Sequence, residues 1–251
     1  MKYKIHRAVV IGAGTMGAAV AAHLANAGVS SWLLDIVPTK LTPEEEARGL
    51  TLQDKVVRNR VVQQGFDRMI KSRPASLLSP DQAGIISVGN LEDNFDVVAN
   101  ADWIIEVIVE NLKIKQELMA RIDAVRSPYA IVSTNTSGIP IASIAEGRSD
   151  GFRQHFLGTH FFNPPRYLKL LEVIPGKETL PEVLKTIIHF GQFRLGKGIV
   201  VCHDTPNFIG NRLAFGGGAF ALHYILENGY TVDEVDAITG PLIGRPKTAT
   251  F

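Results

Sequence analysis

Residues 11–17 read Ile-Gly-Ala-Gly-Thr-Met-Gly; an apolar run precedes them and an alanine-rich helical pattern follows. Glycines in the order G-x-G-x-x-G between a strand and a helix are typical of a dinucleotide-binding fold. Gly12 would permit the tight turn, Gly14 would let the backbone approach a pyrophosphate, and Gly17 would let helix and strand pack closely. The predicted cofactor-binding residues of this loop are Gly12, Gly14, Thr15, Met16 and Gly17.

Asp35 ends the next apolar run, eighteen residues after Gly17. A carboxylate at this point can accept hydrogen bonds from the adenine ribose hydroxyls, and it would repel a 2′-phosphate. The alternative is that Asp35 only caps the following segment. Because strand, glycines and acid agree in order and spacing, we expect Asp35 to bind NAD in preference to NADP.

Apolar runs alternate with helical patterns along most of the chain, which predicts a parallel sheet with helices on its faces. The predicted strands are 5–11, 31–36, 85–88, 103–107, 130–134, 156–162, 170–174 and 198–202. The predicted helices are 16–27, 43–69, 112–125, 181–194, 207–228 and 232–239. The fold class is therefore α/β, a Rossmann-type doubly wound sheet over residues 1–203, followed by an all-helical segment over 204–251.

The helical segment begins after a predicted hinge at His203–Pro206 and contains the run Gly216-Gly217-Gly218. Each glycine inside a helix costs roughly 1 kcal/mol relative to alanine. Two explanations stay open: another helix approaches closely there, or the helix is interrupted.

The composition and charge indicate which partners and which compartment to expect. The chain has 251 residues, of which 45% are hydrophobic and 20% charged, with a net charge of +1. That balance gives no reason to expect nucleic acid or a membrane surface as a partner. The single cysteine fits a reducing compartment, and the N-terminus runs directly into a strand without a signal-peptide pattern. We therefore expect a cytoplasmic location.

His160 and Glu172 form the best candidate for acid–base chemistry, because they lie on two consecutive apolar runs. If those strands are neighbours, a buried glutamate can hold one imidazole nitrogen and leave the other free. Imidazole takes and returns protons near neutral pH, as a general base must. From these residues alone, a purely structural His–Glu hydrogen bond explains the pair equally well.

Ser137 follows the strand at 130–134, at the end of a parallel strand where doubly wound sheets bind ligands. The alternative is a cap for the short helix beginning near Pro140. Both roles are compatible with the sequence.

Five stretches resemble the L-3-hydroxyacyl-CoA dehydrogenases of fatty-acid β-oxidation. They are IGAGTMG (11–17), EVIVENLKIKQEL (106–118), STNTSGIPI (133–141), GTHFFNPPRYLKLLEVIPG (158–176) and DTPNFIGNRL (204–213). The resemblance runs from residue 4 to the end of the chain and is weakest over residues 40–95. It implies NAD-dependent oxidation of (S)-3-hydroxyacyl-CoA to 3-oxoacyl-CoA, with His160 as general base and Glu172 as its orienting partner.

Further roles are implied by the same motifs. Glu110 and Lys115 would lie beside the cofactor, and Asn135 would contact it near the nicotinamide. Ser137 would hydrogen-bond the reacting oxygen, and Asn163 and Asn211 would line the substrate site. Without the motif, Asn211 would be taken for an ordinary polar residue of a helix face.

The resemblance also sets expectations for the assembly. Relatives continue beyond this point with more helices, so the helical domain over 204–251 is expected to be incomplete, and its complete form to make a homodimer. In some relatives this unit is fused to an enoyl-CoA hydratase. The family's charged arm contacts CoA; here Arg68, Lys71, Ser72 and Arg73 are available, but a solvated helix face explains them equally well.

There are two alternatives to this enzyme. One is a non-catalytic NAD-binding relative on the same fold, against which Ser137, His160, Glu172 and Asn211 argue. The other is a dehydrogenase of the 3-hydroxyisobutyrate type, which uses a catalytic lysine and which the His-Phe-Phe-Asn-Pro stretch at 160–164 does not fit.

Overall fold

The computed structural model describes residues 3–244 and 250, and the chain forms two compact units, Met1–Phe208 and Ile209–Phe251. The sequence pattern placed the division after residue 203, but the five residues that follow pack on the first unit. Asp204 accepts hydrogen bonds from the backbone N–H groups of Ile141 and Ala142 at 2.9 and 3.0 Å, and Phe208 is buried.

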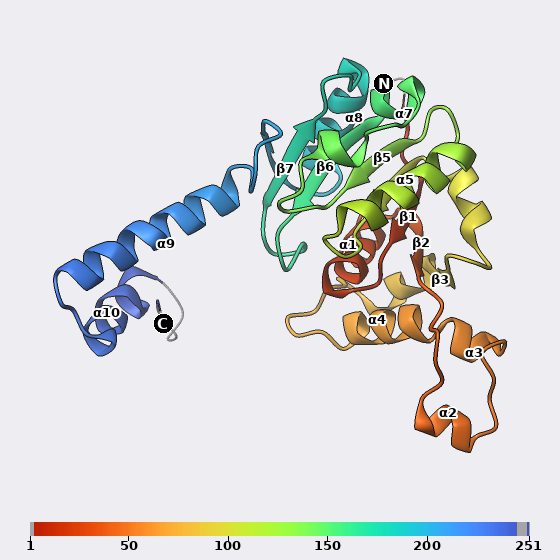
Figure 1. The fold of residues 1–251 in the computed structure, drawn as a ribbon, viewed down its shortest axis with the longest axis horizontal. Helices are drawn as coiled ribbons and strands as arrows, with labels where there is room; N and C mark the ends of the chain where they lie inside the picture. The colour runs from red at the N-terminus through yellow and green to blue at the C-terminus, as the bar shows by residue number, and fades with distance from the viewer. Residues whose placement is uncertain (1–2, 245–249, 251) are drawn as a thin grey trace. The chain divides into compact units, whose positions relative to one another are not determined.

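An eight-stranded sheet forms the centre of the first unit, in the order β3-β2-β1-β4-β5-β6-β7-β8 (Figure 1). Its strands are β1 Arg7–Ile11, β2 Ser30–Asp35, β3 Ile86–Asn90, β4 Trp103–Glu106, β5 Ile131–Thr134, β6 Phe156–Phe161, β7 Leu170–Pro175 and β8 Gly198–Val201. Neighbouring strands are parallel except β6 and β7, which pair antiparallel. The doubly wound α/β fold is thus confirmed, with strand ends within two residues of those predicted.

Helices cover both faces of this sheet. Those of the first unit are α1 Thr15–Asn26, α2 Pro43–Ala47, α3 Lys55–Arg58, α4 Arg60–Ile70, α5 Leu112–Val125, α6 Ile141–Ile144, α7 Asp150–Gln154 and α8 Pro181–Phe193. Buried side chains of α1, α4 and α8 form one apolar cluster with the sheet, and those of α5, α6 and α7 form a second one. The helices lie on the faces of the sheet, and connecting loops follow the carboxyl ends of its parallel strands. In such sheets ligands bind at these ends.

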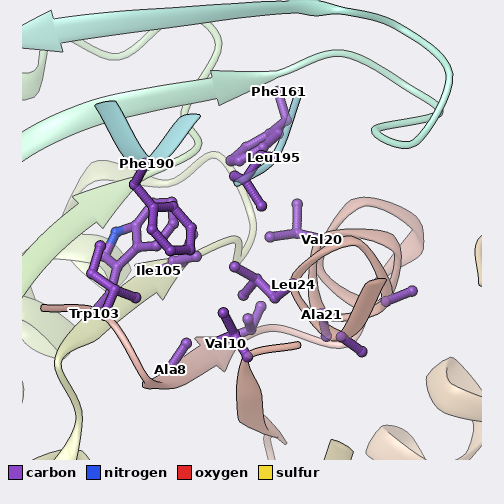
Figure 2. Close-up of a cluster of buried hydrophobic side chains, with 14 of the residues drawn as sticks. Ala8, Val10, Val20, Ala21, Leu24, Trp103, Ile105, Phe161, Phe190 and Leu195 are labelled. Carbon is purple, nitrogen blue, oxygen red and sulfur yellow. The ribbon is translucent and has the colours of Figure 1, made fainter. Parts of the chain in front are cut away.

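Alanines let α1 lie close to the strands. Figure 2 shows Val20, Ala21 and Leu24 of α1 facing Val10 and Ile105 of β1 and β4. Burial of each large aliphatic side chain contributes roughly 1.5–3 kcal/mol, so these contacts hold α1 against the sheet.

The prediction of one long helix over 43–69 is wrong, because the segment forms three shorter helices. The first, α2, ends at Ala47, and Gly49 then takes a φ of +70°, which a helix cannot continue. Asp54 accepts hydrogen bonds from the N–H and hydroxyl of Thr51 and so starts a new turn before α3. Asn59 separates α3 from α4.

The second unit contains α9 Gly210–Glu227 and α10 Val232–Thr239. The predicted start of α9 at residue 207 is too early, because Asn207 and Phe208 have positive φ angles of 63° and 47°. The run Gly216–Gly218 lies within a continuous helix, and no described atom lies within 4 Å of a Cβ added to it. Neither explanation offered for these glycines is therefore seen in the described residues. No helix of residues 3–244 has the length and apolarity needed to cross a membrane.

His23 makes the stability of the first unit depend on pH. It lies on α1, 8% exposed, with Nε2 3.1 Å from the Leu195 carbonyl oxygen. Burial, and next the charge of Lys197, lower the pKa of His23 to about 4. The folded state therefore binds this proton less readily than the unfolded state, so stability is full above the ordinary histidine pKa and falls as the pH drops toward 4.

We expect the free energy of unfolding to contain a His23 contribution that falls by about 2 kcal/mol between about pH 7 and about pH 5. Urea unfolding of the unsubstituted protein and of His23→Gln at both pH values measures it. The pH-dependent loss should be smaller in the variant by that amount; equal losses in the two proteins would contradict the assignment.

Candidate active site

His160 and Glu172 lie directly opposite each other on the antiparallel strands β6 and β7. The imidazole Nδ1 is 2.7 Å from Glu172 Oε2, and both side chains are buried, with 4% and 0% of their surface exposed. A carboxylate at this distance accepts the Nδ1–H of a neutral imidazole. The arrangement leaves Nε2 as the acceptor nitrogen of His160.

Ser137 lies at that second nitrogen, with its Oγ 3.1 Å from His160 Nε2. The rings of Phe162 and Phe208 pack on the imidazole with centroid distances of 4.6 and 5.6 Å. These contacts fix the ring plane, while Ser137, half-buried, faces the carboxyl ends of the strands. A hydroxyl, an imidazole and a carboxylate therefore form one hydrogen-bonded series.

The alternative role of Ser137, as a cap of the helix after it, belongs to another residue. The first two backbone N–H groups of α6 donate to the carboxylate of Asp204. Ser137 Oγ thus hydrogen-bonds His160, and Asp204 is the residue that caps α6.

Of the three asparagines predicted for the site, Asn135 lies beside the dyad. Its Oδ1 accepts a hydrogen bond from the Phe161 N–H at 2.9 Å, which ties the end of β5 to β6. Asn163 is exposed and follows β6. Asn211 lies in the first turn of α9, in the second unit, and its role stays a prediction.

Asn163 lines a groove of about 220 Å³ at the start of α1. The lining side includes three of the four candidate donors on the charged segment, Arg68, Ser72 and Arg73, together with Gly14 and Thr15. The groove therefore brings cationic groups of the arm to the loop that carries the glycine motif.

The glycine loop has the shape expected for a pyrophosphate cradle. Gly12 has a φ of +107°, and a Cβ there would collide with the Val107 carbonyl oxygen. A Cβ on Gly17 would collide with the Gly12 carbonyl oxygen, whereas one on Gly14 would meet no described atom within 4 Å. Gly12 and Gly17 are thus required by the fold of the loop, and Gly14 leaves free space at the N-terminus of α1, where backbone N–H groups favour an anion.

Asp35 lies beside this cradle at the end of β2. Its carboxylate accepts hydrogen bonds from the N–H groups of Ala13 at 2.5 Å and Ile36 at 2.7 Å. It borders a groove of about 470 Å³, whose other lining residues include Gly12, Gly14, Ile36, Leu91, Ile108, Ile114 and Arg121. A mostly apolar groove with the Asp35 carboxylate beside the glycine loop fits the adenosine half of a dinucleotide; Glu117 and Arg121 of α5 also line it.

A buried charge network adjoins the loop that carries Ser137. The ammonium group of Lys115, 1% exposed, lies 2.7 Å from Glu106 Oε1 and 3.8 Å from Glu110 Oε2. Glu110 in turn accepts hydrogen bonds from the Ser137 N–H and the Thr136 hydroxyl, both at 2.8 Å. In this structure Glu110 thus contacts both Lys115 and the Ser137 loop, and Lys115 contacts Glu106 and Glu110.

Three residues of the site were missed by reasoning from the sequence. Glu106 had a usable signal, since a lone acid that ends the apolar run at 103–106 must find a partner when buried. Asp204 and Phe208 had none, because both come into the site from a segment that was assigned to a hinge and helix.

The family model described as "3-hydroxyacyl-CoA dehydrogenase, NAD binding domain" matches residues 7–205. The chain belongs to this family. Residues 7–205 are thus an NAD-binding domain of the 3-hydroxyacyl-CoA dehydrogenase type, and NAD as the cofactor is confirmed.

Two relatives within the family are similar over almost the whole chain. A Bacillus subtilis protein named "Probable 3-hydroxyacyl-CoA dehydrogenase" is 54% identical over 100% of this chain. A Deinococcus radiodurans protein of the same name is 46% identical over 99%. Among solved structures, an (S)-3-hydroxybutyryl-CoA dehydrogenase from Ralstonia eutropha is 25% identical with a TM-score of 0.74, covering 97% of this chain and 79% of that one.

These relatives differ in length. The chain spans 32% of the Bacillus subtilis protein and 68% of the Deinococcus radiodurans protein. It also spans 33% of a Rickettsia felis protein named as a fatty acid oxidation complex trifunctional enzyme, to which it is 35% identical. The 3-hydroxyacyl-CoA dehydrogenase unit is therefore joined to other units in some relatives.

Proposed function

We propose that the protein catalyses NAD-dependent oxidation of (S)-3-hydroxyacyl-CoA to 3-oxoacyl-CoA in fatty-acid β-oxidation. The observation that carries the proposal is the series Ser137–His160–Glu172, which lies at the same edge of the sheet as the glycine loop after β1. The similarity to proteins named 3-hydroxyacyl-CoA dehydrogenase supports the same reaction.

His160 is the general base of the proposed reaction. Its Nε2 accepts the proton of the 3-hydroxyl group, and Glu172 stabilises the imidazolium that results. NAD, when bound, supplies the acceptor for the hydride that leaves C3, and the product is a 3-oxoacyl thioester. In the reverse direction the protonated His160 returns the proton to the carbonyl oxygen.

Ser137 orients the reacting oxygen by a hydrogen bond, with Asn163 and Asn211 as further proposed contacts of the substrate. Hydride transfer requires near-contact geometry, so a hydroxyl held 3.1 Å from the base is well placed to align the substrate oxygen. Gly12, Gly14, Gly17 and Asp35 would hold the cofactor, with Glu110, Lys115 and Asn135 closer to the reacting end.

The family resemblance also supports a substrate, an assembly and a compartment for the protein. We propose an acyl-CoA as the substrate, a homodimer as the assembly and the cytoplasm as the compartment. The groove lined by Arg68, Ser72 and Arg73 supports an anionic substrate, because two of its lining residues are arginines.

Oxidation of NADH that depends on acetoacetyl-CoA tests the proposed function, with the full-length protein and with free acetoacetate and NADPH as comparison substrates. We expect turnover with acetoacetyl-CoA and NADH and far slower reaction with the other two. Binding of NADH without turnover of any acyl-CoA would overturn the proposal and identify a non-catalytic NAD-binding relative.

Asp35→Asn should reduce the preference for NADH over NADPH by at least about 10-fold, since the amide no longer repels a 2′-phosphate. The asparagine keeps one acceptor oxygen, which can hold the hydrogen bond from Ala13 in the loop, and it gives up the bond from Ile36. Asp35→Ala removes both properties and should also weaken NADH binding. Ratios of kcat/KM for the two cofactors measure the effect, with Asp81→Asn, on an exposed turn, as control; an unchanged ratio in Asp35→Asn contradicts the assigned role.

A further inference from the structure

Glu106 is a fully buried carboxylate at the end of β4. It accepts hydrogen bonds from Lys115 Nζ at 2.7 Å, from the Thr134 hydroxyl at 2.6 Å and from the Ile108 N–H at 2.7 Å. One side chain thus joins the loop after β4, helix α5 and the end of β5.

Stability alone does not account for this pair of charges. Removing a carboxylate and an ammonium from water costs solvation free energy that their attraction repays only in part, and apolar residues of similar volume often stabilise a fold equally well. Glu106 and Lys115 have less than 2% of their surface exposed, so the cost is close to its maximum here. The pair is better explained by what it holds in place.

The segment held by this pair is Thr134–Ser137. Thr134 Oγ1 donates to Glu106 and accepts from the Thr136 N–H at 3.2 Å. Further along, Glu110 accepts from the Thr136 hydroxyl and from the Ser137 N–H. The segment that presents Ser137 to His160 is therefore held by hydrogen bonds to two carboxylates, that of Glu106 at its first residue and that of Glu110 at its last two.

Lys115 lies between those carboxylates. Its ammonium contacts Glu106 at 2.7 Å and Glu110 at 3.8 Å. Its positive charge attracts both the buried Glu106 and the exposed Glu110, and so links the two groups that hold the segment.

We propose that Glu106 is a positioning residue for the reaction: through Thr134 directly, and through Lys115 and Glu110, it holds Ser137 at hydrogen-bond distance from His160. The inference rests on the proposed function, since it assigns Glu106 to the alignment of Ser137. Glu106 itself contacts neither His160 nor Glu172 among the hydrogen bonds of the described residues.

A double-mutant cycle between Glu106→Gln and Ser137→Ala tests this coupling in the full-length protein. Glu106→Gln should lower kcat for acetoacetyl-CoA reduction by about 10-fold, because small displacements of an aligning group cost rate steeply. In the Ser137→Ala background the same substitution should lower kcat by less than about twofold, since the group that it positions is gone. Glu182→Gln, the same change at an exposed position of α8, is the control and should leave both backgrounds unchanged.

Thr134→Val serves where Glu106→Gln impairs folding, because it removes one hydroxyl and leaves every charge in place. It should lower kcat by about threefold or more, again only when Ser137 is present. Equal losses in both backgrounds, or no loss in either, would overturn the inference while the unsubstituted protein remains active. An unsubstituted protein that turns over no acyl-CoA would overturn the proposed function as well.

Discussion

His160→Gln is expected to lower kcat for acetoacetyl-CoA reduction by about 10³-fold while the dissociation constant of NADH stays nearly unchanged. Glutamine can occupy the space of the imidazole and accept a hydrogen bond, but it cannot carry a proton between substrate and solvent. The side chain is buried against Glu172, Ser137 and two phenylalanine rings, so its loss affects the proton transfer more than the cofactor groove. Steady-state kinetics and fluorescence titration with NADH measure the two quantities.

The controls separate chemistry from packing. His189→Gln alters an exposed histidine of α8 and should leave kcat unchanged. Glu172→Gln keeps a hydrogen-bond acceptor for Nδ1 but not the charge that stabilises the imidazolium, so an intermediate loss is expected. A large loss of NADH affinity in His160→Gln would show that the residue is structural or binds the cofactor.

Gly17→Ala is expected to lower both the stability of the protein and its affinity for NADH. The new methyl group would overlap the Gly12 carbonyl oxygen and lie 3.4 Å from Val107 Cβ, so α1 must move away from the loop. Overpacking of this kind costs typically 1–3 kcal/mol. Urea unfolding should show that loss, and the displaced cradle should weaken NADH binding by about 10-fold or more.

Gly14→Ala is the matched variant for this prediction. A Cβ on Gly14 meets no described atom within 4 Å and its φ of −64° suits alanine, so the free protein should lose only the difference between Gly and Ala as the N-cap of α1, roughly 0.5–1 kcal/mol. Binding should still weaken by about 10-fold, because the methyl group occupies the space expected for the pyrophosphate. If Gly14→Ala binds NADH normally, the cradle lies elsewhere on α1.

The sheet could be predicted from the sequence because its strands carry their signal locally. Runs such as Ala8–Ile11 and Trp103–Ile105 are apolar throughout, as strands buried on both faces are, and each is soon followed by a turn or a helix cap. The prediction of one helix over 43–69 was wrong for the opposite reason. Its charged helical pattern is continuous in sequence, and only the backbone of Gly49 and the side chain of Asp54 divide it.

The site could be predicted where two residues share neighbouring strands and could not where a distant segment closes on it. His160 and Glu172 follow from two apolar runs once these pair. The cap of α6 depends on Asp204, 63 residues after Ile141, and no local pattern indicates that contact. The same holds for Phe208, whose unusual φ brings its ring onto His160.

The antiparallel pairing of β6 and β7 has a consequence for how this enzyme class can diversify. Because His160 and Glu172 are cross-strand partners in a ladder, the spacing of their backbones is set by the pleat of the sheet and does not depend on the connection over residues 163–169. That connection can be lengthened, shortened or exchanged while the acid–base pair keeps its geometry, provided that the pairing register is kept. Because Asn163 is a proposed substrate contact, we expect a new turn there to alter substrate preference, whereas a slip of a single residue in either strand would turn one member of the pair to the opposite face.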